Sequence, residues 1–91
     1  MPDKVHCAHI LVRTEQEART VLARISKGEK FAKIAQEASI CPSKKNGGDL
    51  GTFTRGKMVK EFETAAFTLQ KGQVSGIVKT QFGYHIIKRL E

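Results

Sequence analysis

Apolar residues recur with a two-residue period near both ends of the chain. Residues 5–12, VHCAHILV, predict a strand with positions 5, 7, 9 and 11 on one face and positions 6, 8, 10 and 12 on the other. Residues 84–90, YHIIKRL, predict a second strand, and shorter strands are predicted at 50–54 and 74–78. Each of the two terminal strands also sets a histidine among its aliphatic residues.

Helical spacing follows the first strand. Thr14 and Glu17 match a capping box, after which apolar residues recur every three or four positions until Gly28, a typical helix stop. A second, shorter helix is predicted at 30–38, where apolar residues line one side.

Residues 39–56 lose this periodicity and contain a proline, an asparagine and four glycines. A loop of this length inside a compact domain is more often functional than idle, and Asp49 should hydrogen-bond the backbone of its own loop. Helical spacing returns at 57–67, KMVKEFETAAF, with Met58 and Phe62 on one helical face.

The order of the segments is strand, two helices, loop, short strand, helix, strand and strand. This order predicts an α+β fold, a four-stranded antiparallel sheet with about three to four helices packed around it. The two long apolar strands should pair at its centre, which would bring His9 and His85 together across the sheet. Ninety-one residues suit one core, so we expect a single domain spanning 1–91.

Charge and hydropathy narrow the choice of partners and location. The net charge is +7, but the sixteen Lys and Arg residues are scattered, as on a solvated surface. No zinc-finger, basic-helix or RNP pattern is present, so neither nucleic acid nor an anionic membrane surface is supported as a partner. No apolar run approaches a membrane span, and the first residues, MPDKVHC, lack the apolar stretch of a secretory signal. We therefore expect a cytoplasmic protein.

The two cysteines, Cys7 and Cys41, are too few for a disulfide framework and lack the CxxC spacing of zinc or redox sites. We expect free thiols, with Cys7 a small apolar filler of the first strand. Cys41 also admits a thiol-protease interpretation, but the sequence offers no clear orienting Asn or Asp and no oxyanion-hole motif. No metal or cofactor is expected.

The chain resembles the parvulins, the small class of peptidyl-prolyl cis/trans isomerases, from Val5 to Leu90. Any one matching segment would be weak evidence, but four segments in the same order make the resemblance specific. These segments are HILV at 9–12, CPSKKNGGDLGTF at 41–53, RGKMVKEFETAAF at 55–67 and TQFGYHIIKR at 80–89. The resemblance implies a parvulin/FKBP-like fold. It also implies a monomeric isomerase and folding chaperone that acts on proline-containing peptides and on unfolded or partly folded proteins.

The resemblance carries over eight functional positions. The catalytic set is His9, Cys41, Thr80 and His85, and the substrate-binding set is Leu50, Met58, Phe62 and Phe82. It implies that His9 and His85 hydrogen-bond to each other and hold the floor of the site, with little direct part in chemistry. Taken alone, each histidine could instead be an ordinary core residue with satisfied polar atoms.

Rotation about an Xaa-Pro bond breaks no covalent bond, and its barrier of about 18–20 kcal/mol comes from amide resonance. Catalysis therefore requires an apolar pocket that grips the proline ring, donors for the rotated carbonyl, and exclusion of water. Met58 and Phe62 suit the walls of such a pocket, and we expect both to lie partly open to solvent.

The sequence also bears on substrate preference. Parvulins that recognise phosphoserine or phosphothreonine before proline carry a long, Arg-rich loop after the first strand, whereas this chain has only Arg13 and Thr14 there. We therefore expect a non-phospho-specific enzyme, and Val59 and Phe82 favour a medium-to-large hydrophobic residue before proline. The alternative function is a non-catalytic peptide- or polyanion-binding module on the same fold.

Overall fold

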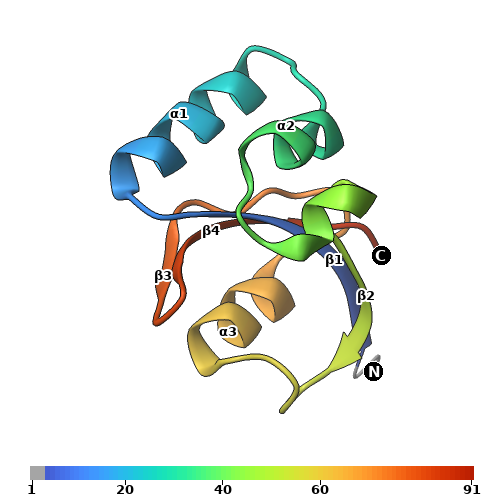
Figure 1. The fold of residues 1–91 in the computed structure, drawn as a ribbon. Coiled ribbons are helices and arrows are strands. Elements are labelled where there is room, and N and C mark those ends of the chain that lie inside the picture. The colour runs from blue at the N-terminus through green and yellow to red at the C-terminus, as the bar shows by residue number, and fades with distance from the viewer. Residues whose placement is uncertain (1–3) are drawn as a thin grey trace.

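A computed structural model describes residues 4–91, which form a four-stranded antiparallel sheet, three α-helices and a short 3₁₀ helix at Pro42–Asn46. The strands are β1 (Lys4–Val12), β2 (Asp49–Thr54), β3 (Val78–Thr80) and β4 (Gly83–Arg89), in the spatial order β2-β1-β4-β3. The first and last strands therefore pair at the centre of the sheet, as predicted (Figure 1). The α+β class is confirmed.

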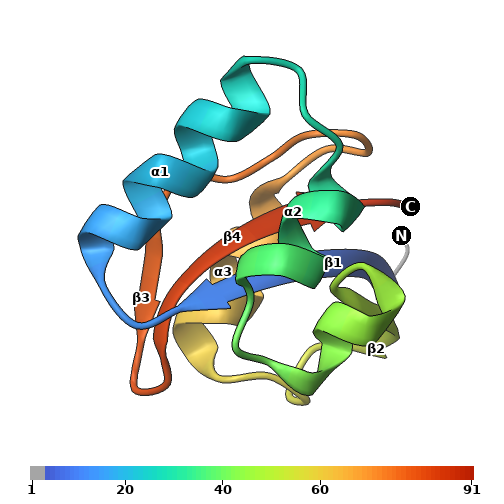
Figure 2. The ribbon, with the colours of Figure 1, turned by 45° about the horizontal axis from the view of Figure 1, so that its top comes forward.

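Helices cover both faces of the sheet. α1 (Glu15–Ser26) and α2 (Phe31–Ala38) lie on one face, and α3 (Lys60–Thr68) lies on the other (Figure 1 and Figure 2). The residues of β1 divide accordingly: Ala8, Ile10 and Val12 belong to the core under α1 and α2, whereas Val5 and Cys7 belong to the core under α3. The predicted alternation along this strand is confirmed, and both of its faces are used for packing. Among residues 4–91, no helix is long and apolar enough to cross a membrane.

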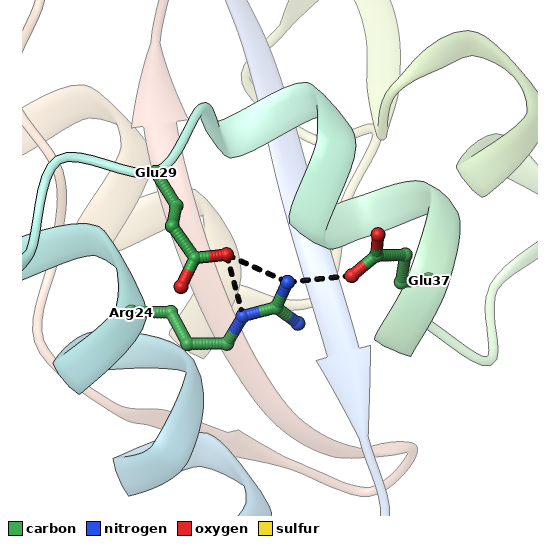
Figure 3. Close-up of polar contacts among 3 residues, drawn as sticks. All are labelled: Arg24, Glu29 and Glu37. Carbon is green, nitrogen blue, oxygen red and sulfur yellow. Dashed lines mark hydrogen bonds and ion pairs between the residues drawn. The ribbon is translucent and has the colours of Figure 1, made fainter.

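Local polar contacts fix the two helices on the first face. The Thr14 hydroxyl accepts the N–H of Glu17 at 3.1 Å and begins α1, as the capping box predicts. At the other end of α1, Arg24 Nη2 lies 2.7 Å from Glu29 and 2.5 Å from Glu37 of α2 (Figure 3). All three side chains are partly exposed, so this network orients α1 and α2 more than it stabilises the fold.

The predicted start of the third helix is wrong. α3 begins at Lys60, because Gly56 adopts a φ of 87° in a turn and Val59 is still extended. Met58 therefore precedes the helix and does not share a helical face with Phe62.

The predicted strand at 74–78 is also wrong in its bounds. Regular pairing begins only at Val78, and Val74 contributes one isolated bridge to Lys88. Between them, the side-chain hydroxyl of Ser75 accepts the N–H of Ile87 at 2.9 Å, where a regular ladder would use a backbone carbonyl. The regular strand is interrupted at Ser75 because its side chain takes the place of a backbone carbonyl.

The turn-rich loop is fastened to the centre of the sheet. β2 pairs with β1 only as far as Ala8 opposite Asp49. Beyond that point the N–H of His9 donates to the carbonyl of Gly48 at 2.9 Å, so the loop replaces β2 along the edge of β1. Gly48 has a φ of 86°, and a Cβ at this position would collide with the carbonyl oxygen of His9. Only glycine allows this approach.

We therefore expect Gly48→Ala to destabilise the protein more than Gly72→Ala. Gly72 has a φ of 87° but its Cβ would meet open space, so both variants strain the backbone and only Gly48→Ala must also push the loop from β1. In urea denaturation, the free energy of unfolding should fall by about 1 kcal/mol in Gly72→Ala and by about 2 kcal/mol more in Gly48→Ala. Equal losses would contradict a tight approach of the loop to β1.

Candidate active site

A groove of about 370 Å³ opens on the α3 side of the sheet. Seven of the eight predicted site residues line it: His9, Cys41, Leu50, Met58, Phe62, Phe82 and His85. The eighth, Thr80, lies behind the groove, where its hydroxyl is 2.7 Å from Nε2 of His85. The pairing of β1 with β4 supplies the floor. The loop, β2, the start of α3 with the residues before it, and the β3–β4 turn supply the walls.

His9 and His85 form the predicted pair. They are diagonal neighbours across the β1–β4 ladder, with His9 opposite Ile87 and His85 opposite Leu11. Their Nδ1 atoms are 3.0 Å apart, and the stacked rings lie 5.1 Å apart. Burial lowers the pKa of each imidazole to about 4, and in His9 the neighbouring His85 adds to the effect. Both rings are therefore neutral at pH 7.

The hydrogen bonds of the pair have a defined direction. The N–H of Phe82 can only donate, and it donates to Oγ1 of Thr80 at 3.1 Å. The Thr80 hydroxyl then has its hydrogen free for Nε2 of His85, which leaves the hydrogen of His85 on Nδ1, where it is donated to Nδ1 of His9. His9 consequently carries its hydrogen on Nε2, the one buried side-chain nitrogen or oxygen within residues 4–91 that lacks a hydrogen-bond partner.

The reverse arrangement satisfies fewer groups. If His85 donated from Nε2, Oγ1 of Thr80 would accept twice and its own hydrogen would have no acceptor among its described contacts. Nε2 of His9 would remain without a partner as well. One orphaned donor is less costly than two unsatisfied groups, so the first arrangement is the stable one.

Phe62 is buried, so the expectation that it lies partly open to solvent is wrong. Only 3% of its surface is exposed, whereas Met58 is half-buried as expected. α3 turns the Phe62 ring under the histidine pair, with its centroid 5.5 Å from His9 and 5.2 Å from His85, both in T-shaped contact. Phe62 therefore serves as groove wall and core residue at once, and its truncation would lower the stability by about 3–5 kcal/mol.

Neither cysteine is arranged as a nucleophile. Cys41 lies at the groove, where its Sγ accepts a hydrogen bond from the Ser43 hydroxyl at 3.2 Å, and no described hydrogen bond joins it to a histidine. Cys7 is fully buried, and burial raises the pKa of its thiol to about 11. Cys7 is thus the apolar filler that the sequence predicts, and the geometry offers no thiol-protease dyad.

Three groove residues were missed by the sequence analysis: Leu11, Ile40 and Pro42. Ile40 and Phe82 are 42% and 59% exposed, the large apolar residues of the described chain that face solvent. A bulky aliphatic residue within an otherwise polar loop was the signal that could have identified Ile40. Val59 lines the groove, as expected.

Asp49 organises the loop beside the groove. Its Oδ1 accepts the N–H of Gly51 at 2.7 Å, as predicted, and Nε2 of His6 at 2.6 Å. The Gly51 bond first, and then His6, lowers the pKa of this carboxyl. Across residues 4–91, no group of three His, Cys, Asp or Glu side chains could hold a metal ion.

Comparisons with known proteins agree with the geometry. A family model described as rotamase, PPIC-type PPIase domain, matches residues 9–91. The foldase protein PrsA of Geobacillus kaustophilus is 57% identical over 86 residues, which cover 93% of this chain and 31% of that protein. The chain thus spans about a third of the length of the curated relatives that it matches.

Two of the matching solved structures are covered over nearly their whole length. NmPin, the parvulin of Nitrosopumilus maritimus, is 51% identical with a TM-score of 0.90, covering 100% of this chain and 99% of that one. CsPin, the Pin protein of the archaeon Cenarcheaum symbiosum, is 58% identical with a TM-score of 0.87, covering 100% and 95%.

The histidine pair predicts a pH-dependent stability. Because the pKa of each imidazole is lowered from about 6.5 in the unfolded chain to about 4, its stabilising contribution is complete above pH 6.5 and is lost as the pH falls toward 4. Urea denaturation should show the free energy of unfolding falling by about 2–4 kcal/mol between pH 7 and pH 5. In the control variant His9→Gln/His85→Gln most of this dependence should disappear, and an unchanged slope would refute the assignment.

Proposed function

Because the chain belongs to the PPIC-type peptidyl-prolyl isomerase family, the parvulins, we propose that it isomerises Xaa-Pro bonds and assists protein folding. The observation that most directly supports this proposal is an apolar groove whose floor is a neutral, hydrogen-bonded pair of histidines. Such a floor offers a polar but uncharged surface in a site from which the substrate expels water. We propose the same activity for any longer protein that contains these residues.

The mechanism that fits these residues is non-covalent rotation of the amide. The side chains of Leu50, Met58 and Phe62 grip the proline ring, while the preceding carbonyl swings in the open part of the groove. Excluding water removes hydrogen bonds that favour the planar, dipolar amide over the twisted one. The Cys41 thiol, itself held by the Ser43 hydroxyl, presents a polarisable group to the moving carbonyl and forms no bond to it.

The histidines support this mechanism as a scaffold. With pKa values of about 4, neither imidazole takes up a second proton near pH 7, so neither is available there as an imidazolium acid. Their contribution is to keep the hydrogen-bond chain from Phe82 through Thr80 to His9 in one arrangement, which fixes the floor under the bound proline.

The substrates we propose are peptides and unfolded protein segments with a medium-to-large apolar residue before proline. The exposed side chains of Ile40 and Phe82 border the groove and would cover such a residue. The connection between β1 and α1 is short, with Arg13 exposed, so it offers no clamp for a phosphate.

A protease-coupled or NMR exchange assay on a panel of Xaa-Pro peptides tests the activity and the preference together. The net charge of +7 keeps a polyanion-binding module as the second candidate. Binding to DNA or anionic vesicles that weakens steeply with salt, without isomerase activity, would favour that candidate. The monomeric state and the cytoplasmic location are also proposals, which light scattering and cell fractionation would test.

We expect Met58→Ala to lower kcat/KM by about tenfold or more while leaving the fold intact. Met58 is half-buried and precedes α3, so its truncation removes groove surface without opening the core. Leu22→Ala is the matched control, because Leu22 is also half-buried but packs on the opposite face of the sheet. The expected loss corresponds to about 1.4 kcal/mol, the value of a partly buried side chain. Equal activity of the two variants would mean that the proline pocket is misplaced.

Cys41→Ser should keep measurable isomerase activity, because the position requires a small polar group and not a nucleophile. The hydroxyl of the new serine can accept the same hydrogen bond from Ser43. In kinetic assays, kcat/KM should fall by at most about tenfold. Removal of an attacking nucleophile would instead lower the rate by roughly 10⁶-fold. Mass spectrometry of wild-type protein with a proline peptide provides the decisive check, since a covalent acyl-enzyme would rule out the mechanism.

A further inference from the structure

A buried serine hydroxyl joins β1 to the wall of the groove. Beyond the end of β2, the N–H of Leu11 points to an open strand edge. The hydroxyl oxygen of Ser39 accepts this N–H at 3.0 Å and also accepts the N–H of Cys41 at 3.3 Å. Ser39 is only 3% exposed, so water cannot take its place. One oxygen atom therefore serves the central strand and the loop at the same time.

The main chain around Ser39 completes the attachment. The N–H of Ile40 donates to the carbonyl of Leu11 at 2.8 Å, and the N–H of Ser39 donates to Ala35 at the end of α2 at 3.1 Å. The next three residues, 40–42, all line the groove. The distance of this wall from the histidine floor is thus set at Ser39.

We infer that Ser39 is a positioning residue for the substrate, whose hydroxyl holds Ile40 and Cys41 ready to receive a peptide. The inference rests on the proposed function. Ile40 is 42% exposed although its backbone is tightly bonded, which is the arrangement expected of a preorganised binding wall. Without the Ser39 acceptor, this wall would have to become ordered when the peptide binds. The loss should therefore fall on peptide binding and KM more than on kcat.

Ser75 offers a matched control at the opposite edge of the central strand pair. Its hydroxyl accepts the N–H of Ile87 at 2.9 Å, and Ile87 is fully buried in β4. Ser75 does not line the groove. Ser75→Ala therefore removes the same kind of hydrogen bond from a central strand without touching the binding wall.

The test compares Ser39→Ala, Ser39→Thr and Ser75→Ala with the wild type. Urea denaturation measures stability, kinetic assays measure KM and kcat, and an NMR titration measures Kd for a short peptide with Leu before proline. Both alanine variants should lose stability, Ser39→Ala more because its oxygen accepts two N–H groups and that of Ser75 accepts one. Only Ser39→Ala should raise KM and Kd, by about fivefold, with a smaller change in kcat. Ser39→Thr keeps the acceptor and should restore peptide binding.

Several outcomes would overturn the inference. These are a folded Ser39→Ala that binds the peptide as the wild type does, an equal loss of binding in Ser75→Ala, or a folded Ser39→Thr that binds no better than Ser39→Ala. If Ser39→Ala does not fold, Ser39→Cys replaces it under reducing conditions, because it keeps the volume and weakens the acceptor. A wild type that binds the peptide without isomerising it would refute only the proposed function, since Kd still tests Ser39. A wild type that does not bind the peptide would refute both.

Discussion

The antiparallel pairing of β1 with β4 is the interaction on which the rest of the structure depends. It joins the two ends of the described chain, and it places His9 and His85, 76 residues apart in sequence, within hydrogen-bond distance. A shift of one residue in this register would turn one imidazole to the opposite face and separate the pair. The packing of α1 and α2 on one face and of α3 on the other favours this register, because a slip of one residue would exchange the two sets of β1 side chains between the two cores.

Two imidazoles in an apolar sheet are tolerated because their hydrogen bonds form one directed chain. The backbone N–H of Phe82 donates to Thr80, so the Thr80 hydroxyl donates to His85 and His85 in turn donates to His9. Only the final Nε2 lacks a partner, and the His9 ring that carries it makes a T-shaped contact with the ring of Phe62. Burial and neutrality support each other here, since a charged imidazole in this position would lose its solvation without gaining an anion.

The sequence predicted the central pairing of the first and last strands, the two faces of β1 and the approach of the two histidines, because hydrophobic period and strand pairing decide them. It predicted the capping of α1 from the capping box at Thr14 and Glu17. It also predicted most of the side chains that share the groove, but only through the four matching segments. It did not predict that Met58 precedes α3, because a turn at Gly56 interrupts the helical spacing of apolar residues. It also did not predict that Phe62 is buried. Nor did it predict the roles of Ser39 and Ser75. Both act as acceptors at strand edges, and the need for an acceptor appears only when the edges are placed in space.

The groove therefore combines two kinds of support that respond differently to change. Its floor is held by a strand pair inside the core, so most substitutions there would act on stability before they act on substrate choice. Its wall at Ile40 and Cys41 is carried by a loop and attached to β1 through the Ser39 hydroxyl and one main-chain bond. The side chain of Ile40 on this wall is exposed to solvent and can vary without disturbing the core. The floor and the wall of the groove therefore differ in how freely their side chains can change, because only the floor is part of the core.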